Sequence, residues 1–510
     1  DALGANTTAS NNTAVGNLAL RSNTTGTENT AVGSAALAVN TTANSSTAMG
    51  FSSLVANTTG AANTAFGHKA LFANTTAQYN VAVGQAALET NTTGANNTAV
   101  GRAALISNTT ASNNTAVGQN ALLANTTGNL NIAVGNESLA TNTVGDRNVA
   151  MGYQALTTFN PASNVDSYNT AMGHASLKSL TTGTKNTAIG GLAMETATTG
   201  VDNTALGYGA LYANTTASNN TGLGTSALAA NTTGASNVAV GQVALQANTT
   251  AAENTAVGRA AMYTNTTGAS NAAFGTDALY SNTTGASNVA LGAYSLDANT
   301  TASNNTAVGV HALGANTTGT ANTAVGTNAL DSLTTGEGNV AVGYNNDVDS
   351  GDRIRSYGLG INLSLATNNS VKIGNAGTNI QCDWGGGATW SHNSDERLKN
   401  NIQDSSLGLD FINDLRPVTY NWKEQEDIPE EIRDESEKDT KSLQHGLVAQ
   451  EVKATLNKLG VNEFSGWSEG KDSIQRISES MYVFPLIKAV QELSTQVDEL
   501  KQELKTLKGE

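Results

Sequence analysis

The sequence is poor in several residue types from which most soluble domains are built. Only 13% of its 510 residues are charged, 5% are aromatic, and Cys382 is the only cysteine. A single cysteine excludes an intrachain disulfide and a cysteine-rich metal site, and we expect a buried free thiol. No apolar run approaches the roughly 18 residues that mark a transmembrane helix, and no signal-peptide pattern is present, so we expect no membrane insertion.

Basic residues are also scarce. The formal net charge is −16, and residues 1–343 hold 7 Lys and Arg against 13 Asp and Glu. Without a basic face, we expect no binding of nucleic acid through its phosphates. His68, His174 and His311 have no companions at ligand spacing, so we predict surface histidines, with no metal site and no cofactor.

What is present instead is a repeat rich in Ala, Asn, Thr and Gly. A core of Asn-x-Ala-x-Gly recurs every 17 residues from Asn12 to Asn148, with Ser46 in one of the Asn slots. An insertion of four residues lies in the stretch 158–168, and the same step then runs from Asn169 to Asn339. Self-similarity of this kind, in about twenty copies, is typical of a stacked repeat architecture.

The copy that begins at Asn97 predicts one coil of a β-solenoid, with two short strands and two turns. Alternation places Val100 on the face opposite to its neighbours, and we expect Val, the Leu of Ala104–Leu105 and some Ala to be buried. Gly101 ends the strand at a bend where a side chain would obstruct the chain. The corner Asn108–Thr110 supplies turn chemistry and an asparagine ladder between coils.

One repeat buries too little apolar surface to offset the ordering of its residues, so stacking is obligatory. At about 4.8 Å per coil, the stack would form a rod of roughly 100 Å. A triple β-spiral, in which each repeat advances further along the axis, remains an open alternative. Most corners, such as Asn23–Thr25 and Asn231–Thr233, also match the acceptor for N-glycosylation, although turn and ladder geometry already explains them.

The Asn-x-Ala-x-Gly core resembles the head repeats of trimeric autotransporter adhesins, with a longer period, and is similar to repeats of phage tail fibres. The resemblance implies a β-roll that associates as a trimer, with residues 1–343 as the shaft. Residues 344–393 form a transition region with β segments at 361–365 and 371–374. We expect Trp384 and Trp390 to plug the end of the stack rather than to bind a glycan.

Three further motifs precede a C-terminal helix. They are Ser-Asp-Glu-Arg-Leu-Lys-Asn-Asn-Ile at 394–402, Leu-Arg-Pro-Val-Thr-Tyr-Asn-Trp-Lys at 415–423 and His-Gly-Leu-Val-Ala-Gln-Glu-Val at 445–452. Together they resemble the endosialidase-type intramolecular chaperone, a family of self-cleaving serine peptidase domains at the C-termini of phage tail fibres and tailspikes. The resemblance implies a trimer in which the chaperone of residues 394–480 aids folding of the fibre, and the fragment from residue 394 to 510 is then released.

Ser394 and Lys399 form the candidate catalytic pair. They are five residues apart, so a bend between them would bring the lysine amine to the serine hydroxyl. An amine acts as a base only when neutral, a form that burial favours. The resemblance implies that Ser394 is the nucleophile, that Lys399 is the general base, and that the bond between Asn393 and Ser394 is cut.

Residues 481–510 predict a coiled coil. Two heptad positions are apolar, one with Val483, Val490, Val497 and Leu504 and the other with Leu486, Leu493, Leu500 and Leu507. Val combined with Leu favours two strands, whereas the resemblance implies three. We expect the trimer, because fibre and chaperone fold around the same axis. Glu503 and Lys508 lie at flanking positions suited to pairing between chains.

The sequence therefore predicts a mainly β fold: a trimeric β-solenoid or β-roll, then a small α+β chaperone domain that ends in a coiled coil. The predicted function is that of a homotrimeric extracellular fibre, a phage tail fibre of the virion that contacts a host-surface receptor, which we expect to be a glycan. Its only predicted enzymatic activity is a single-turnover self-cleavage.

Other functions remain open. A bacterial surface adhesin or extracellular filament with the same chaperone is the main alternative. A glycan-degrading tailspike is disfavoured, because no carboxylate pair stands out in the repeats. Because the sequence starts at Asp1 rather than Met, we expect a processed or truncated product whose attachment region precedes it.

Overall fold

The structure is a computed structural model that describes residues 1–383, 390–392, 396, 399–430, 440–470 and 473–509. The chain divides into two compact units, Asp1–Asn393 and Ser394–Glu510.

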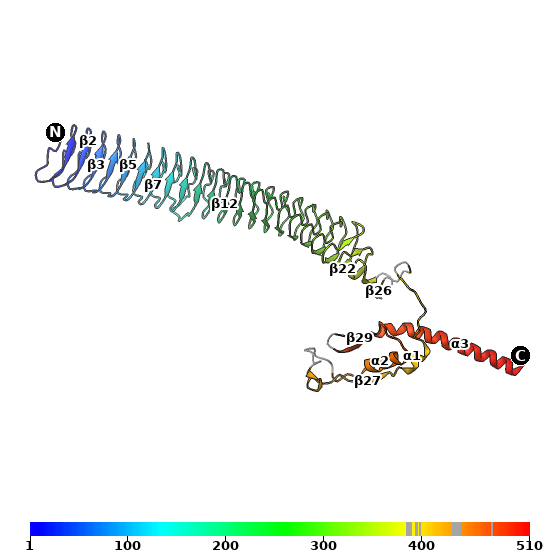
Figure 1. Ribbon diagram of the computed structural model, residues 1–510. Coiled ribbons are helices and arrows are strands. Elements are labelled where there is room, and N and C mark those ends of the chain that lie inside the picture. The colour runs from blue at the N-terminus through cyan, green and yellow to red at the C-terminus, as the bar shows by residue number, and fades with distance from the viewer. Residues whose placement is uncertain (384–389, 393–395, 397–398, 431–439, 471–472, 510) are drawn as a thin grey trace. The chain divides into compact units, whose positions relative to one another are not determined.

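The first unit is a parallel β-solenoid of about 21 turns, drawn from blue to yellow-green in Figure 1. Each 17-residue coil contributes one strand of three residues, which pairs in parallel with the strand of the next coil, from β1 (Thr13–Val15) to β20 (Val340–Val342). The solenoid prediction is confirmed, and the triple β-spiral is rejected. The strands between them are β2 (Thr30–Val32), β3 (Thr47–Met49), β4 (Thr64–Phe66), β5 (Val81–Val83), β6 (Thr98–Val100), β7 (Thr115–Val117), β8 (Ile132–Val134), β9 (Val149–Met151), β10 (Thr170–Met172), β11 (Thr187–Ile189), β12 (Thr204–Leu206), β13 (Thr221–Leu223), β14 (Val238–Val240), β15 (Thr255–Val257), β16 (Ala272–Phe274), β17 (Val289–Leu291), β18 (Thr306–Val308) and β19 (Thr323–Val325).

The prediction of two strands per coil is wrong, because the second apolar segment is a run of turns. In the coil that begins at Asn97, Ala103 and Leu105 adopt left-handed φ angles of 57° and 53°. Each such non-glycine residue costs about 1–2 kcal/mol. The neighbouring coils offset this cost, since the Ala103 N–H donates to the Gln85 carbonyl at 2.9 Å and the Leu105 N–H to the Ala121 carbonyl at 3.0 Å. The conformation of one coil is therefore stable only within the stack.

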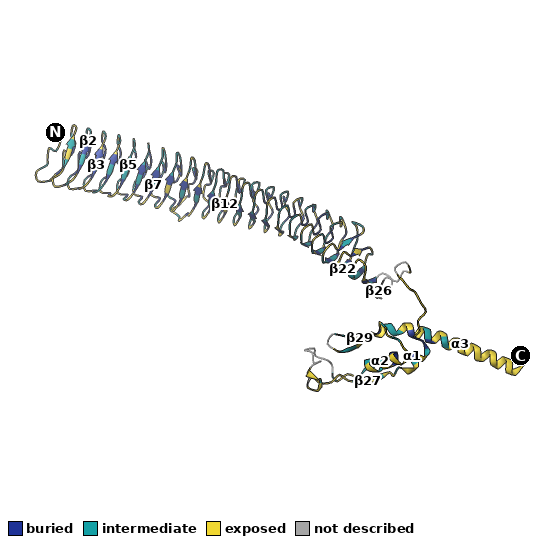
Figure 2. Ribbon diagram, in the orientation of Figure 1, coloured by how far each residue is buried: buried dark blue, intermediate teal, exposed yellow. Residues whose placement is uncertain are grey.

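The interior of the coils is filled mainly by alanine, leucine and asparagine. Figure 2 colours the buried residues of each coil dark blue. In each strand from β2 to β20 the middle residue is buried, whereas the third is half-buried or exposed. Ala104–Leu105 is fully buried as predicted, but Ala99 is buried in place of Val100, so that prediction is wrong. The reason is space: a Cβ at Gly222, the middle residue of β13, would already lie 3.3 Å from Leu211 Cγ.

As a result, the third residues of strands β1–β20, mostly Val with some Met, Phe, Leu and Ile, form one apolar column on the outside of the sheet. We call this the outer column.

The glycine that follows each strand is required by the stack. Gly101 has a φ of 136°, and a Cβ at this position would lie 2.5 Å from the Gly118 carbonyl oxygen of the next coil. Only glycine avoids both the strained angle and the contact with the neighbouring backbone. This confirms the predicted role of the repeat glycine.

Buried asparagines hold the corners together. Asn108 Nδ2 donates to Asn91 Oδ1 of the preceding coil at 2.8 Å and to the Ala111 carbonyl at 3.0 Å. The first Asn of each repeat likewise accepts the backbone N–H of its equivalent in the next coil. The ladder prediction is confirmed. Because Asn23 and Asn231 are fully buried in the same ladder, a glycan on these corners is incompatible with the folded coil.

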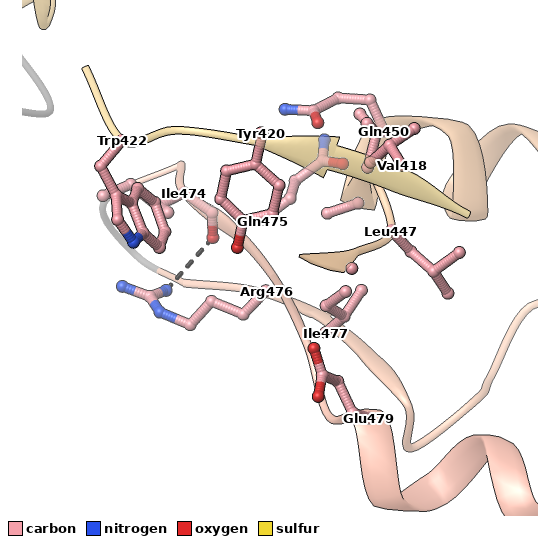
Figure 3. Close-up of a pocket in the computed structure, with 13 residues that line it drawn as sticks. Val418, Tyr420, Trp422, Leu447, Gln450, Ile474, Gln475, Arg476, Ile477 and Glu479 are labelled. Atoms are coloured by element: carbon pink, nitrogen blue, oxygen red, sulfur yellow. Dashed lines mark hydrogen bonds between the residues drawn. The ribbon is translucent and has the colours of Figure 1, made fainter. Parts of the chain in front are cut away.

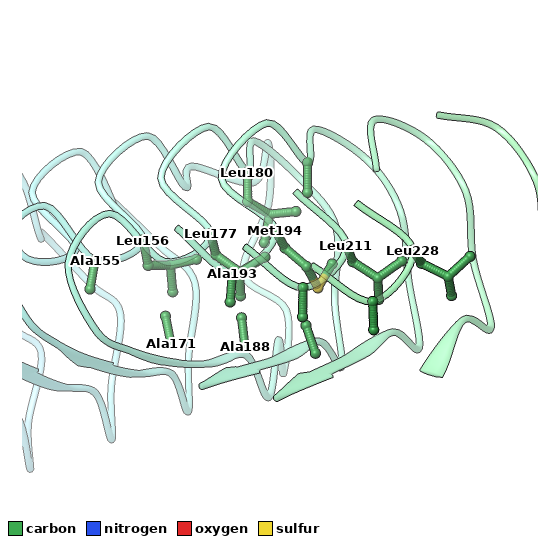
Figure 4. Packing of buried hydrophobic residues seen from close by; sticks show 14 of the residues in the cluster. Ala155, Leu156, Ala171, Leu177, Leu180, Ala188, Ala193, Met194, Leu211 and Leu228 are labelled. Atoms are coloured by element: carbon green, nitrogen blue, oxygen red, sulfur yellow. The ribbon is translucent and has the colours of Figure 1, made fainter. Parts of the chain in front are cut away.

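The corner ladder is interrupted near the four-residue insertion. Phe159, Leu180 and Ala197 take the Asn position in three successive coils, and all are fully buried. Around them the interior becomes continuous apolar packing, as Figure 4 shows for Leu180 and its neighbours. Strands β9 and β10 still pair in register across the insertion, with Thr170 opposite Val149. The chain therefore accommodates the extra residues without breaking the sheet.

Parallel stacking continues past Gly343 before the pairing direction changes. Strand β22 (Ser356–Ile361) pairs in parallel with β20 and with β24 (Ser370–Asn375), and β21 (Asp347–Val348) pairs with β23 (Ser364–Leu365). Strands β25 (Asn379–Asp383) and β26 (Trp390–His392) then add antiparallel. Cys382 is buried as predicted. Trp384 lies outside the described residues, and Trp390 is described only as part of β26.

The second unit combines helices with two small antiparallel sheets. Its elements are α1 (Leu409–Asp414), β27 (Val418–Tyr420), η2 (Gln425–Asp427), β28 (Gln444–Gly446), α2 (Ala449–Lys458), β29 (Trp467–Glu469), β30 (Gln475–Ile477), η4 (Glu479–Tyr482) and α3 (Val483–Lys508). Strand β27 pairs with β28, and β29 pairs with β30. Its small core consists of Leu407, Phe411, Val452 and Leu456.

Candidate functional site

The predicted catalytic pair is described only in part. Asn393 and Ser394 lie outside the described residues. The Lys399 backbone N–H donates to the Glu396 carbonyl at 3.0 Å. Lys399 is exposed in the single chain.

The two downstream motifs that carried the resemblance meet in the fold. Strand β27 lies in the 415–423 motif and β28 overlaps the start of the 445–452 motif, and they pair with Thr419 opposite His445. Next to this pair, Arg416 Nε donates to Glu451 Oε2 at 3.1 Å and joins the start of β27 to helix α2. The hydrogen bonds between the Arg416 guanidinium and the Glu451 carboxylate hold the pKa of Glu451 below its ordinary value. The motif residues therefore fix the geometry of the unit.

A cleft of about 560 Å³ opens between the two small sheets, close to the start of α2 (Figure 3). Tyr420, Trp422 and Leu447 give it an apolar lining, and Arg476 and Glu479 lie at its edge. Arg476 Nη1 donates to the Ile474 carbonyl at 3.1 Å. The described lining contains no Ser, Cys, Lys or His, so none of these described residues is a nucleophile or base of the Ser–Lys type.

Helix α3 exposes a continuous apolar stripe. All eight residues at the two apolar heptad positions are at least 40% exposed, and Leu507 reaches 84%. The residues of this apolar stripe are Val483, Leu486, Val490, Leu493, Val497, Leu500, Leu504 and Leu507. The helix itself is confirmed over Val483–Lys508. A stripe this regular and this exposed is typical of a coiled-coil surface that awaits partner helices.

Sequence reasoning missed the contact that fixes α3 to its own unit. Glu492 Oε2 accepts the Leu409 backbone N–H at 2.7 Å, at the beginning of α1. A Cβ at Gly408 would lie 2.3 Å from this oxygen, so glycine leaves room for the carboxylate. The available signal was an acidic residue on the helix face that points away from the apolar stripe.

The shaft histidines lie at the surface of the coils, each against a ring of the preceding coil. Ring centroids are 5.5 Å apart for Phe51 and His68 and 5.1 Å apart for Tyr294 and His311, and both pairs are stacked. His174 stacks on Tyr153 in the same way. In the part of the chain that the structure describes, no group of three His, Cys, Asp or Glu side chains is placed to hold a metal ion.

A serine peptidase family model, described as the chaperone of endosialidase, matches residues 394–461. The matched range begins at Ser394 and includes β27, β28, α2 and the Arg416–Glu451 pair. No curated protein matches the chain. Within the described ranges, no helix is both long and apolar enough to cross a membrane.

The match and the fold agree with the resemblance seen in the motifs. The C-terminal region is similar to an intramolecular chaperone of a serine peptidase family, and it follows a β-solenoid shaft. This combination suggests a fibre-like or tailspike-like protein.

Proposed function

We propose that the chain is a subunit of a homotrimeric extracellular fibre, in which the solenoid is the shaft and the C-terminal unit is a folding aid. The observation that carries the proposal is the pair of apolar surfaces left uncovered in the single chain, the outer column of the shaft and the apolar stripe of α3. Surfaces of this length on a soluble monomer mark interaction sites. Identical chains in parallel alignment would cover both.

The folding aid is needed because a free coil lacks the hydrogen bonds that neighbouring coils supply. Left-handed residues and buried asparagines bond to the coils on either side, so the first coils are costly to form. A coiled coil of α3 helices would bring three chain ends together and raise the local concentration of shaft segments. Stacking then proceeds from an aligned start.

We further propose that the C-terminal unit is released by cleavage of the peptide bond between Asn393 and Ser394. The Ser394 oxygen would attack the Asn393 carbonyl carbon while Lys399 takes the hydroxyl proton. Lys399 would then return this proton to the Ser394 nitrogen as the peptide C–N bond breaks, which leaves an ester between Asn393 and the Ser394 oxygen that water hydrolyses. Because Lys399 is exposed in one chain, its activation as a base would depend on burial in the assembled trimer. Cleavage would thus follow assembly.

The test is to express the chain with and without Ser394→Ala and to measure mass and oligomeric state. We expect the wild type to lose residues 394–510 and to give a heat-resistant trimer, while the variant stays whole and still trimerises. Lys399→Ala should also stay whole. An uncut wild-type trimer would reject the cleavage step and leave the chaperone role standing, whereas a well-folded wild-type monomer would reject the fibre assignment.

Contact with a host-surface glycan and a place on a phage virion complete the proposal. Support comes from the ring pairs on the shaft surface, such as Phe51 and His68, since aromatic side chains offer large contact areas to a ligand. A glycan panel would test binding, and depolymerisation of the bound glycan would favour a degrading spike instead. Genes for phage baseplates, rather than for a secretion system, next to the coding gene would separate the virion from the adhesin alternative.

A further inference from the structure

The second unit leaves two apolar features unmatched beside the stripe of α3. One is a groove of about 430 Å³, lined by Ile412, Leu415, Pro417, Leu447, Glu479, Tyr482, Val483 and Leu486. The other is the side chain of Ile487, which is 50% exposed on the first turns of α3, next to Phe484, which is 55% exposed. The groove and Ile487 belong to the same unit, but Ile487 does not line the groove. Among the described residues, the groove is open and the Ile487 side chain is half exposed.

The heptad places them on opposite flanks of the helix. With Val483 at position a and Leu486 at position d, Ile487 occupies position e, and Ala489 occupies position g. Position g faces the chain's own unit, because Ala489 is buried there and α1 packs against α3 on that side through Glu492 and Leu409. The e flank, with Ile487, is the one that the chain's own unit leaves uncovered.

In a parallel coiled coil, the g residue of one helix faces the e residue of its neighbour in the following heptad, five positions later. Glu503 and Lys508 obey this rule and have complementary charges, which supports the parallel register. The same register places Ile487 of the neighbour against Tyr482. Tyr482 lines the groove, and the groove opens between α1 and the apolar stripe, on the g flank.

We propose that the groove of each chain receives Ile487 of a second copy. Each chaperone unit would then contact its neighbour's α3 as well as its own α3. Contacts between the helix of one chain and the globular part of the next would stabilise the trimer in addition to contacts between the apolar stripes. The inference rests on the proposed parallel trimer. It predicts that the short α3 assembles as three strands because the neighbouring units add apolar contact that the stripe alone lacks.

A disulfide cross-link tests the geometry. Two differently tagged full-length chains, both carrying Ser394→Ala to keep the units joined, are co-expressed with Ile487→Cys in one and Leu415→Cys in the other. We expect an oxidised band that contains both tags, at least tenfold stronger than in the matched control with Thr495→Cys in place of Ile487→Cys. Thr495 is exposed on the outer flank of the same helix. Equal yields from the two pairs would overturn the proposal.

Charge substitutions separate the groove from the stripe. Ile487→Asp should shift the trimer midpoint to at least tenfold higher protein concentration in analytical ultracentrifugation, while Thr495→Asp should not. Leu493→Asp, in the stripe, should abolish the trimer. If Leu493→Asp disrupts the trimer and Ile487→Asp does not, the groove contact is wrong and the fibre assignment survives. If the wild-type chain never trimerises, the proposed function itself fails.

Discussion

The shaft and the C-terminal unit are stabilised by different kinds of contact. In the shaft, each coil finds its hydrogen-bond and packing partners in the coil before and the coil after, and asparagine is as much a core residue as leucine. In the C-terminal unit, a cluster centred on Phe411 forms a conventional core, while the longest helix is exposed on its apolar stripe. The comparison teaches that the shaft is stabilised along its axis by its own coils, whereas the C-terminal unit leaves the apolar stripe of α3 uncovered in the single chain.

The largest effect is expected from Gly190→Ala, which attacks stacking directly. Gly190 has a φ of 134°, and a Cβ there would lie 2.4 Å from the Gly207 carbonyl oxygen. Strain and collision together should cost more than about 4 kcal/mol. Because a coil contacts only its neighbours, hydrogen exchange should rise mainly in the adjacent coils.

The next residue provides the matched control. A Cβ at Gly191 would meet only the Tyr208 ring, at 3.5 Å, so Gly191→Ala should leave hydrogen exchange and melting of the shaft unchanged. Similar losses for both variants would show that the coils are not held by close backbone contact.

A second substitution tests the conventional core. Phe411 is fully buried, and Phe411→Ala should destabilise the C-terminal unit by about 3–5 kcal/mol. Unlike the shaft variant, it should melt the whole unit together, seen as loss of the helical circular dichroism signal. Leu443→Ala, at a residue that is 60% exposed, is the control and should have little effect. A purely local response to Phe411→Ala would erase the contrast between the units.

A smaller effect is expected from one rung of the ladder. Asn108→Ala removes a donor to Asn91 and an acceptor for Asn125, whose amide lies 2.9 Å away, and should cost about 1–3 kcal/mol in chemical denaturation. Thr110→Ala, at an exposed position of the same corner, is the control. If both variants denature alike, the asparagines are spacers and not the polar core that the comparison assumes.

The smallest effect is expected at the exposed Arg416–Glu451 pair. The pKa of Glu451 is lowered in the fold, so the pair stabilises above the ordinary carboxyl value of 4.5 and loses this contribution as the pH falls through the lowered value. Arg416→Ala should therefore lower the melting temperature slightly near about pH 7, and by less as the pH falls through the lowered pKa of Glu451. A larger drop at the acidic pH would contradict the sign of the shift.

The repeat geometry was predictable where chemistry alone decides it. Gly101 and Asn108 have roles that follow from the absence of a Cβ and from amide hydrogen bonding, and both were found as predicted. The left-handed Leu105 was not predictable, because leucine disfavours this conformation and only stacking imposes it. The alternating pattern places Val100 and Ala99 on opposite faces of the strand, but it does not determine which face is buried. The narrow interior of the coil determines this, because it accommodates the smaller Ala99.

The motifs of the candidate site were predictable from the sequence, but the arrangement of their residues in space was not. The motifs at 415–423 and 445–452 were recognised in sequence, and their pairing through β27 and β28 needed the fold. The exposure of Lys399 could not be read from its neighbours in the sequence, because burial there depends on what else is assembled around it. The catalytic assignment of Ser394 and Lys399 stays a prediction.

The four-residue insertion has a consequence for alignment. A periodic rod has translational degeneracy: if identical chains lie side by side, an offset of one coil leaves almost every contact equivalent and nearly equal in energy. The 21-residue step from Asn148 to Asn169 breaks that symmetry, because it makes one coil larger than the others. Phe159, Leu180 and Ala197 are buried inside the coils, so the larger coil itself is what an offset between neighbouring chains would misplace.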